Sequence, residues 1–397
     1  MPDRIYADNA ATSFPKPPEV LVAMRRYAEE LGASAGRGAY REAVETGELV
    51  ADCRRRVARL IHAADARNIV FTLNCTEALN LAIKGLLQPG DHVVTSAMDH
   101  NSVLRPLAAL QTQRGITVTY VRADAVTGLV DPADMLSAVT PRTRLVALAH
   151  ASNVTGTLQD VGSVGRELRK RGVPFLVDAA QTLGHLPIDV ADLGIDLLAA
   201  PGHKGLMGPL GTGFLYIRPG LENQMSPLVE GGTGSVSEEP TQPTFMPDRF
   251  ESGSHNAIGL AGLAAALRWI ESRTVASLRE HDLALSKRFL DDIAGREGVT
   301  LFGPTDPRNR VSVFAIRVAG FDPAELSAAL DADFGILSRS GIQCAPLAHE
   351  TIGTLTTSGT TRLSFGAFNT LEDVSRCVAG LMDLAAAGTP AAVTPTS

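Results

Sequence analysis

The sequence predicts an α/β protein, with a large domain whose mainly parallel sheet is sandwiched by helices and a smaller α+β domain towards the C-terminus. Between about residues 66 and 220, short runs rich in β-branched residues alternate with segments of helical periodicity. A stretch rich in Pro, Gly and Ser, 227–255, interrupts this alternation. Longer helical patterns and further short strands follow it, which indicates a second structural unit. A chain of 397 residues is long enough for both.

The individual elements can be placed in chain order from these patterns. Strands of the large sheet are expected at 68–72, 92–96, 117–121, 144–150, 174–179, 196–200 and 213–217. Helices are expected at 77–87, 161–171, 257–272 and 275–293. The smaller unit has expected strands at 311–318, 335–339 and 361–365, with helices after Asp322 and from Leu371. We therefore predict a large domain at 17–255, a small domain at 256–386 together with 1–16, and a flexible tail at 387–397.

Composition excludes several classes of function. The net charge is −7, from 43 acidic and 36 basic residues that are well mixed, so a nucleic-acid partner is not expected. The charged start does not resemble a signal peptide, and no apolar run is long enough for a membrane span. Four cysteines, at 53, 75, 344 and 377, lack the density or spacing of a disulfide framework or a zinc site. We predict a cytoplasmic protein without a metal.

Polar residues directly after the expected strands are the first candidates for a site, because ligands of open α/β sheets bind beyond the carboxyl ends of the strands. Taken singly, Thr76 or Asn153 reads most simply as a helix cap or a turn residue. The pair of Asp178 and Lys204 is more informative. An acid after one strand and a lysine in a glycine-rich loop after the next match the needs of pyridoxal phosphate (PLP), which forms an imine and carries a pyridine nitrogen.

Each of these residues has a definite chemical task in such a site. A buried Asp178 would hold the proton on the pyridine nitrogen, and glycines around Lys204 would allow close approach and desolvation, which lowers the pKa of the amine. Without Asp178 the lysine loop would read as a glycine turn with a surface lysine. The chain lacks both GxxxxGK[ST] and a GxGxxG that opens a helix. A phosphate is therefore expected at the helix start after Cys75, with Thr76 as the leading side chain.

The motifs identify a family. The sequence resembles cysteine desulfurases of the class V aminotransferase superfamily, PLP enzymes of fold type I, in the group II branch close to selenocysteine lyases. The resemblance covers nearly the whole chain and rests on ADNAATSFPKPP, NCTEALNLA, MDHNSVLRPL, HASNVTGT, VDAAQTLG, GHKGLMGPLGTG, FESGSHN, SRSGIQCAPLAH and TRLSFGAFNT.

This resemblance implies a role for each matching residue. Lys204 would be the imine lysine, Asp178 would hold the ring nitrogen, and Gln181 the ring hydroxyl. His100 would stack on the ring and act in catalysis. The remaining implied contacts are Thr76, His203 and, from a second subunit, Ser254 to the phosphate, Cys75 packed beside it, and Asn153, Arg362 and Arg339 at the substrate. A homodimer follows from the contribution of Ser254.

The residue that the resemblance makes catalytic for sulfur transfer is Cys344. A lone cysteine is usually a small buried hydrophobe, which is how we interpret Cys53 and Cys377 in helical stretches. Cys344 follows Arg339 and a glycine and precedes a proline, which indicates a loop where a thiolate can be exposed. The loop departs from many relatives, since Ile342 and Gln343 stand where those have histidines. Pro201 likewise stands near the lysine where relatives have a hydroxyl residue.

The expected reaction is therefore conversion of L-cysteine to L-alanine with a persulfide on Cys344, passed to a thiol acceptor such as a sulfur-acceptor protein. Lysis of selenocysteine or cysteine sulfinate needs the same pocket and stays open as an alternative. Transamination is weaker, because it gives Cys344 no role. A non-catalytic scaffold for sulfur assembly is disfavoured by the intact Lys204 and Asp178. A nicotinamide oxidoreductase lacks its glycine fingerprint.

Overall fold

The centre of the structure, a computed structural model that describes residues 4–36 and 38–388, is a seven-stranded sheet. The strand order is β2-β8-β7-β6-β5-β3-β4. Strand β8 runs antiparallel to both of its neighbours, β2 and β7, and the other neighbouring pairs are parallel. The strands are β2 (Ile69–Thr72), β3 (His92–Ser96), β4 (Thr117–Val121), β5 (Thr143–Ala149), β6 (Phe175–Asp178), β7 (Leu197–Pro201) and β8 (Gly213–Ile217). The predicted fold class, a mainly parallel sheet between helices, is confirmed.

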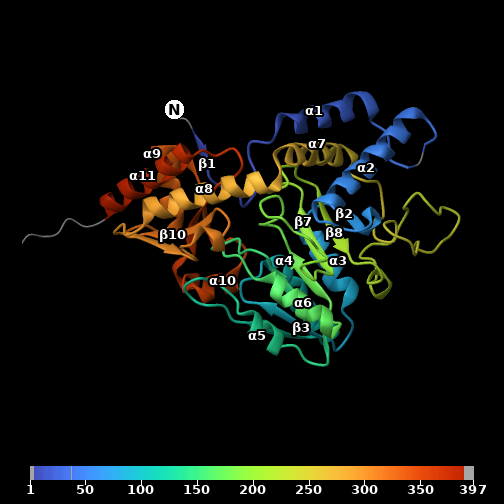
Figure 1. Cartoon of the computed structure of the whole chain (residues 1–397), viewed down its shortest axis with the longest axis horizontal. Helices are drawn as coiled ribbons and strands as arrows, with labels where there is room; N and C mark the ends of the chain where they lie inside the picture. The colour runs from blue at the N-terminus through green and yellow to red at the C-terminus, as the bar shows by residue number, and fades with distance from the viewer. Residues whose placement is uncertain (1–3, 37, 389–397) are drawn as a thin grey trace, which may run out of the picture.

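Helices cover both faces of this sheet (Figure 1). Residues of β5 alternate between two hydrophobic clusters, with Val146 and Leu148 in one and Leu145 and Ala147 in the other. Both faces of the strand are therefore buried, which explains its nearly continuous apolar run. The first cluster includes residues of α2 (Arg41–Leu60), α5 (Pro132–Ser137), α6 (Val161–Arg171) and α7 (Ala257–Arg273), and the second includes residues of α3 (Cys75–Leu86) and α4 (Asn101–Arg114).

The C-terminal part builds a second core around a four-stranded antiparallel sheet of order β12-β13-β10-β9. Its elements are α8 (Val275–Ile293), β9 (Val299–Phe302), β10 (Val313–Val318), α9 (Pro323–Phe334), β11 (Ile336–Leu337), β12 (Arg339–Gly341), α10 (Pro346–Thr351), β13 (Thr360–Ser364) and α11 (Leu371–Gly388). Strand β1 (Ile5–Tyr6) pairs in parallel with β11, so the start of the chain joins this C-terminal part, to the left in Figure 1.

The remaining helices are short or lie at the edges. They are α1 (Pro18–Arg26), the π-helix η1 (Tyr27–Leu31) and the 3-10 helices η2 (Ala66–Asn68), η3 (Glu222–Gln224), η4 (Pro307–Asn309) and η5 (Leu355–Thr357). Helix α7 packs with α1 and α2 on the large sheet, although the predicted domain boundary at 255 placed it in the small domain. We propose that the boundary between the domains follows α7. The predicted tail begins inside α11, and residues 389–397 lie outside the described part of the chain.

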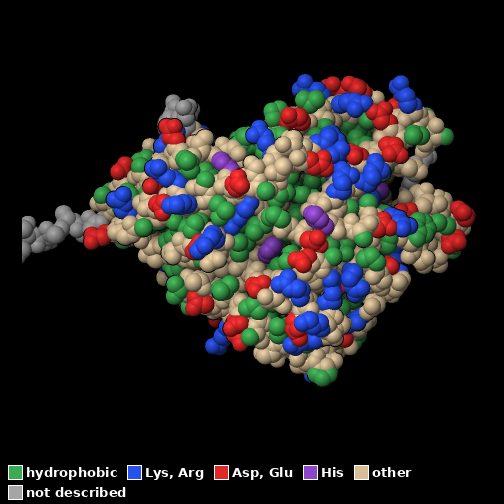
Figure 2. All heavy atoms as spheres, in the orientation of Figure 1, with side chains coloured by type: hydrophobic (Ala, Val, Ile, Leu, Met, Phe, Trp, Pro, Cys, Tyr) green, Lys and Arg blue, Asp and Glu red, His purple; other side chains and the backbone are tan. Residues whose placement is uncertain are grey.

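Surface charge agrees with the mixed composition. On the face shown in Figure 2, acidic and basic side chains are interspersed over both parts of the molecule. Among the described residues, no helix is both long enough and apolar enough to cross a membrane.

Candidate active site

A cavity opens at the carboxyl ends of β5, β6 and β7. Eight of the residues singled out from the sequence line it, namely Cys75, Thr76, His100, Asn153, Asp178, Gln181, His203 and Lys204. They converge because parallel neighbouring strands end at the same edge of the sheet.

Asp178 is the last residue of β6 and is buried. Its Oδ1 accepts a hydrogen bond from the Ala180 backbone N–H at 2.9 Å. The same oxygen lies 3.6 Å from the Cys75 Sγ, whose thiol donates to it. Burial, followed by the charge of Asp178, raises the pKa of Cys75 well above its usual value, so this thiol stays protonated. Both of these contacts use Oδ1, and Oδ2 can accept from a protonated ring nitrogen.

Lys204 lies in the loop after β7, on backbone that packs unusually closely. A Cβ added at Gly205 would meet the Leu183 carbonyl oxygen at 2.4 Å, and one at Gly184 would meet the Gly205 carbonyl oxygen at 2.2 Å. Burial lowers the pKa of Lys204, and the opposing pull of Asp178 is weaker. A lowered pKa favours the unprotonated amine, which is the form in which a lysine acts as a nucleophile and a base.

The N-terminal segment fixes the backbone beside Lys204. The His203 carbonyl oxygen accepts from the Ser13 backbone N–H at 3.0 Å, the Thr12 hydroxyl at 3.1 Å and the Lys16 ammonium at 2.8 Å. Meanwhile the Nδ1 of His203 is buried and has no hydrogen-bond partner among the described residues. Burial, with help from Lys204 and Lys16, lowers the pKa of His203 to about 4. A buried polar atom without a partner at a cavity wall indicates a ligand that would satisfy it.

The start of α3 supplies further donors beside His203. The Asn74 side chain accepts from the Glu77 backbone N–H at 2.9 Å, and the Asn74 carbonyl from the Ala78 N–H at 3.3 Å. The first-turn amides of Cys75 and Thr76 have no partner within an α-helix. Together with the Thr76 hydroxyl and the positive end of the helix dipole they form an anion site.

His100 caps α4, and this contact sets its tautomer. Its Nδ1 accepts from the Ser102 backbone N–H at 3.0 Å, which leaves the proton of the neutral ring on Nε2. The Ser102 hydroxyl lies 2.9 Å from the same Nδ1 and 2.8 Å from the Thr76 hydroxyl. Burial lowers the pKa of His100, so the ring is neutral at neutral pH.

Arg362, on β13, does not line the cavity but is bonded to Asn153, which does, and it is held on one side only. Its Nη1 donates to the Asn153 carbonyl at 3.0 Å, and its Nη2 donates to the Asp8 carboxylate at 2.7 Å. The Nε is buried and has no partner among the described residues. Arg339, half exposed on β12, lies 4.0 Å from the other oxygen of Asp8. A free Nε–H on a buried guanidinium suits a carboxylate ligand.

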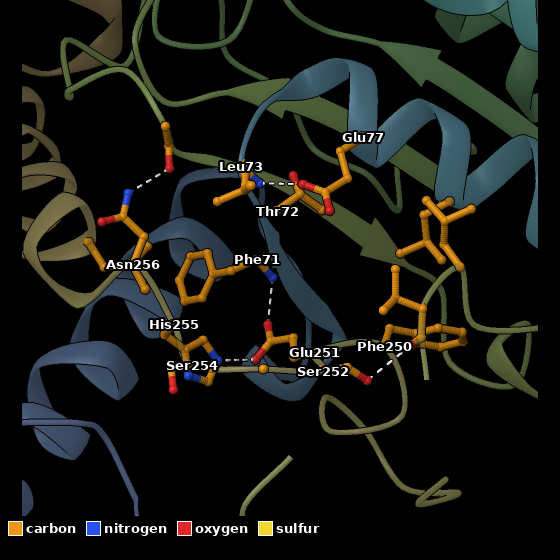
Figure 3. Close-up of a pocket in the computed structure, with 16 residues that line it drawn as sticks. Phe71, Thr72, Leu73, Glu77, Phe250, Glu251, Ser252, Ser254, His255 and Asn256 are labelled. Carbon is orange, nitrogen blue, oxygen red and sulfur yellow. Dashed lines mark hydrogen bonds and ion pairs between the residues drawn. The ribbon is translucent and has the colours of Figure 1, made fainter. Parts of the chain in front are cut away.

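Besides Arg362 and Arg339, two further predicted residues lie outside the cavity wall. Cys344 is exposed on the turn between β12 and α10, and the carbonyl of its neighbour Gln343 accepts from the Asn153 side chain at 2.6 Å. Ser254 is exposed and lines a different pocket of about 860 Å³, formed with Phe71, Phe250 and others (Figure 3). The structure thus joins Cys344 to the cavity through one hydrogen bond and leaves Ser254 apart from the cavity of its own chain.

Comparison with known proteins decides the family. The model of the family described as aminotransferase class-V matches residues 5–377. The chain belongs to the aminotransferase class-V family. A probable cysteine desulfurase from Methanothermobacter thermautotrophicus is 36% identical over 389 residues, which cover 97% of this class-V chain and 96% of the relative. A cysteine desulfurase from Yersinia pseudotuberculosis is 32% identical over 385 residues, 95% of this chain and 92% of the relative.

Two solved structures of cysteine desulfurases superpose closely on this chain. The apo structure of a cysteine desulfurase from Thermococcus onnurineus has a TM-score of 0.91 at 35% identity and covers 97% of this chain and 95% of its own. A cysteine desulfurase from Escherichia coli, in an S-sulfonic acid form, has a TM-score of 0.86 at 32% identity with the same coverage. The match spans both the sheet with Lys204 and the C-terminal part with Cys344.

Two residues of this class-V site had no role in the sequence-based prediction. Asp8 pairs with Arg362 across 354 positions, and Ser102 joins Thr76 to His100. Asp8 lies in a recognised motif, ADNAATSFPKPP, but its partner depends on tertiary structure. Ser102 directly follows the start of α4, and its position two residues after His100 was a readable signal of a capping contact.

Proposed function

We propose that this protein is a PLP-dependent cysteine desulfurase that converts L-cysteine to L-alanine and forms a persulfide on Cys344. One observation carries the proposal. A single cavity holds the Lys204 amine, the Asp178 carboxylate and an anion site with unpartnered donors, and the exposed thiol of Cys344 stands on a turn bonded to a residue of that cavity. The curated relatives named cysteine desulfurase cover the same length of chain.

The residues present fit PLP in each of its parts. The phosphate would take the His203 Nδ1, which lacks a partner among the described residues, together with the Thr76 hydroxyl and the first-turn amides of α3. The ring would lie among Asp178, Gln181 and His100. The Gln181 amide is already oriented, because its Nε2 donates to the Ala10 carbonyl at 3.1 Å. Bound PLP supplies a protonated ring nitrogen that stabilises negative charge at the substrate's α-carbon.

The chain's own residues would then bind the substrate and move its protons. The substrate carboxylate would accept from the Arg362 Nε–H and from the Asn153 side chain. Asp178 would keep the ring nitrogen protonated. Lys204, with its lowered pKa, would remove the α-proton, and the neutral His100 could deliver a proton from Nε2.

Sulfur transfer would be the task of Cys344. Its thiolate attacks the substrate Sγ, so an S–S bond forms on Cys344 while the Cβ–Sγ bond of the substrate breaks. The bonding pair of the broken bond stays on carbon and, after protonation, the product leaves as alanine. The persulfide is then open to a second thiol, because Cys344 is exposed whereas Cys53, Cys75 and Cys377 are buried.

Mass spectrometry after incubation with L-cysteine tests this function. We expect one additional sulfur atom on the peptide that contains Cys344, and none in a Cys344→Ala variant, which should keep its yellow colour and its spectral change with cysteine. Cys377→Ala, which removes a buried thiol remote from the cavity, is the control and should carry the extra sulfur like the wild type. Undiminished alanine release by Cys344→Ala would contradict the proposal.

Substrate choice among related amino acids needs a separate comparison. Cysteine, selenocysteine and cysteine sulfinate share the carboxylate and amino groups that the cavity would bind. Alanine release from each, with and without an added thiol, distinguishes them. We expect the rate with cysteine, and not that with cysteine sulfinate, to depend on both Cys344 and the thiol. Faster release from selenocysteine than from cysteine, independent of Cys344, would favour a selenocysteine lyase.

We also propose a cytoplasmic homodimer in which Ser254 completes the partner's phosphate site. Ser254 sits apart from the cavity of its own chain, beside a pocket lined by Leu73, Leu228 and Val229, which are exposed apolar side chains (Figure 3). Four free cysteines suit a reducing compartment. A mixed dimer of Lys204→Ala and Ser254→Ala chains provides the test. If Ser254 acts across the interface, the mixture recovers a wild-type site; if it acts within its own chain, no site is restored.

A further inference from the structure

The turn that carries Cys344 has an unusual backbone. The Ala345 N–H donates to the Ile342 carbonyl at 3.0 Å, and both central residues are left-handed, with φ of 43° at Gln343 and 59° at Cys344. Turns with two left-handed central residues strongly prefer Asn-Gly or Asp-Gly at these positions. Gln and Cys have no such preference. Contacts outside the turn must therefore hold it in this conformation.

The Gln343 side chain supplies such contacts inside the protein. It is buried, and its Nε2 donates to the Thr360 carbonyl of β13 at 2.8 Å. Its Oε1 lies 2.7 Å from the Nε2 of His349 in α10. On the far side of the imidazole, Nδ1 lies 2.7 Å from the Thr354 hydroxyl. We call the side chains of Gln343, His349 and Thr354, with the carbonyl of Thr360, the turn clamp.

The protonation state of the turn clamp follows from its geometry. The Gln343 Oε1 can only accept, so the His349 Nε2 must carry a proton and Nδ1 must accept from Thr354. His349 is completely buried, and burial lowers its pKa to about 4. The imidazole is therefore neutral at physiological pH, and each of its nitrogens has one partner. Neither His349 nor Gln343 lines the cavity, so the mechanism above does not use their side chains.

The backbone of the same turn is tied to the large sheet. The Gln343 carbonyl accepts from the Asn153 Nδ2 at 2.6 Å, and the Cys344 carbonyl accepts from the Asn101 N–H of α4 at 2.8 Å. Asn101 directly follows His100. An amide NH₂ carries two protons, so Asn153 can hold the turn with one and a substrate carboxylate with the other. The turn is thus fixed from both sides, and the Cys344 thiol is the part that faces solvent.

We propose that Gln343 and His349 are positioning residues for Cys344, which hold its turn in the left-handed conformation that presents the thiol to the substrate's sulfur. The inference rests on the proposed function, in which Cys344 is the nucleophile. His349 stands six residues after Gln343, in α10, and acts on the turn through the glutamine.

Substitutions of Gln343 separate the turn clamp from backbone preference. Gln343→Asn favours a left-handed φ but is one methylene too short to keep the contacts to His349 and Thr360. Gln343→Ala has neither the preference for a left-handed φ nor the contacts to His349 and Thr360. We expect both variants to form the Cys344 persulfide about tenfold more slowly in a single turnover, because they lose the buried hydrogen bonds to His349 and Thr360 that hold the turn. Glu350→Ala, at an exposed neighbour of His349 in α10, is the matched control and should behave like the wild type.

Two further measurements distinguish positioning from a general loss of structure. Amide hydrogen exchange of the peptide 340–347 should rise in both Gln343 variants and stay unchanged in the control. The absorbance of the bound cofactor, and the cysteine concentration that gives its half-maximal change, should stay as in the wild type. Should Gln343→Ala not fold, Gln343→Glu answers the same question, because it can accept from His349 but cannot donate to the Thr360 carbonyl.

The outcomes separate this inference from the proposed function. If wild-type protein forms no persulfide on Cys344, the proposed function fails, whatever the exchange data report. If the wild type forms the persulfide and Gln343→Asn does so at the same rate, or if exchange at 340–347 is unchanged in every Gln343 variant, the positioning role is overturned. A slowed persulfide step with unchanged cofactor absorbance and raised exchange supports it.

Discussion

Glu251 is a buried carboxylate outside the cavity with four hydrogen-bond contacts, and its removal should destabilise the whole protein. Its two oxygens accept from Arg54 at 2.6 and 2.8 Å. The Oε1 also accepts from the Phe71 N–H at 2.5 Å (Figure 3). The Nε2 of His255 lies 2.7 Å from Oε2. The guanidinium of Arg54 additionally stacks over the Phe71 ring, 4.5 Å from its centre. Glu251 therefore joins α2, β2 and the loop that bears Ser254.

The expected magnitude follows from the burial of this pair. The side chains of Arg54 and Glu251 are only 10% and 4% exposed. Breaking a buried ion pair by removing one partner costs about 3–5 kcal/mol, because the other charge stays buried without compensation. Burial alone would raise the pKa of Glu251, but Arg54 and His255 together lower it. The contribution is therefore fully present at neutral pH and is lost only as the pH falls through the depressed native pKa.

Urea unfolding at fixed protein concentration provides the assay, since dissociation of a dimer would otherwise change the midpoint. We expect Glu251→Ala to lower the free energy of unfolding by about 3–5 kcal/mol. The double variant Arg54→Met, Glu251→Leu should recover much of that loss, because no charge is left buried. The control is Glu271→Ala, an exposed partner of Arg56, with an expected effect below about 1 kcal/mol. A loss below 1 kcal/mol for Glu251→Ala would refute the reasoning.

Three further expectations follow from the site and its surroundings. Arg362→Lys should raise the KM for cysteine by about ten- to a hundredfold, through loss of the Nε–H donor, with unchanged cofactor absorbance in a titration. Burial lowers the pKa of His150 to about 4, so the native state binds fewer protons than the unfolded state between that pH and 6.5. His150 alone should contribute a fall in stability of about 3 kcal/mol on acidification through this window, and His150→Leu should reduce the slope in urea unfolding by that contribution. Gly205→Ala should abolish cofactor absorbance, because its Cβ would meet the Leu183 carbonyl, whereas Gly47→Ala, with ordinary contacts, should not.

The large sheet was predictable because its strands, apart from the edge strand β4, are buried on both faces. Their runs of apolar residues are nearly continuous, and each expected run forms a strand in the structure. The helix expected from residue 77 begins at Cys75, because the Asn74 side chain caps it. That shift of two residues places Thr76 in the first turn, where a phosphate would bind. The eight polar residues at the strand ends share one cavity for the same topological reason.

Contacts between distant segments could not be predicted from spacing. Arg362 meets Asp8 because β1 adds to the C-terminal part through β11, and no local pattern encodes this pairing. The role of Gln343 was equally hidden. The sequence marked it as a departure from the family, and only the folded chain brings it against His349 and Thr360. Sequence patterns thus identified the cofactor side of the site better than the contacts that hold its cysteine.

The first sixteen residues have a consequence for how this protein can be handled and evolved. Residues 5–6 pair with β11 in the C-terminal part. Within residues 12–16, side chains donate hydrogen bonds to the His203 carbonyl, beside Lys204, in the part that contains the large sheet. The segment links the two parts of the structure, so the distance between the Lys204 amine and the Cys344 thiol depends on its length. An insertion or deletion within residues 7–11 should disturb that spacing while leaving each half folded, whereas an extension ahead of residue 4 would leave it intact.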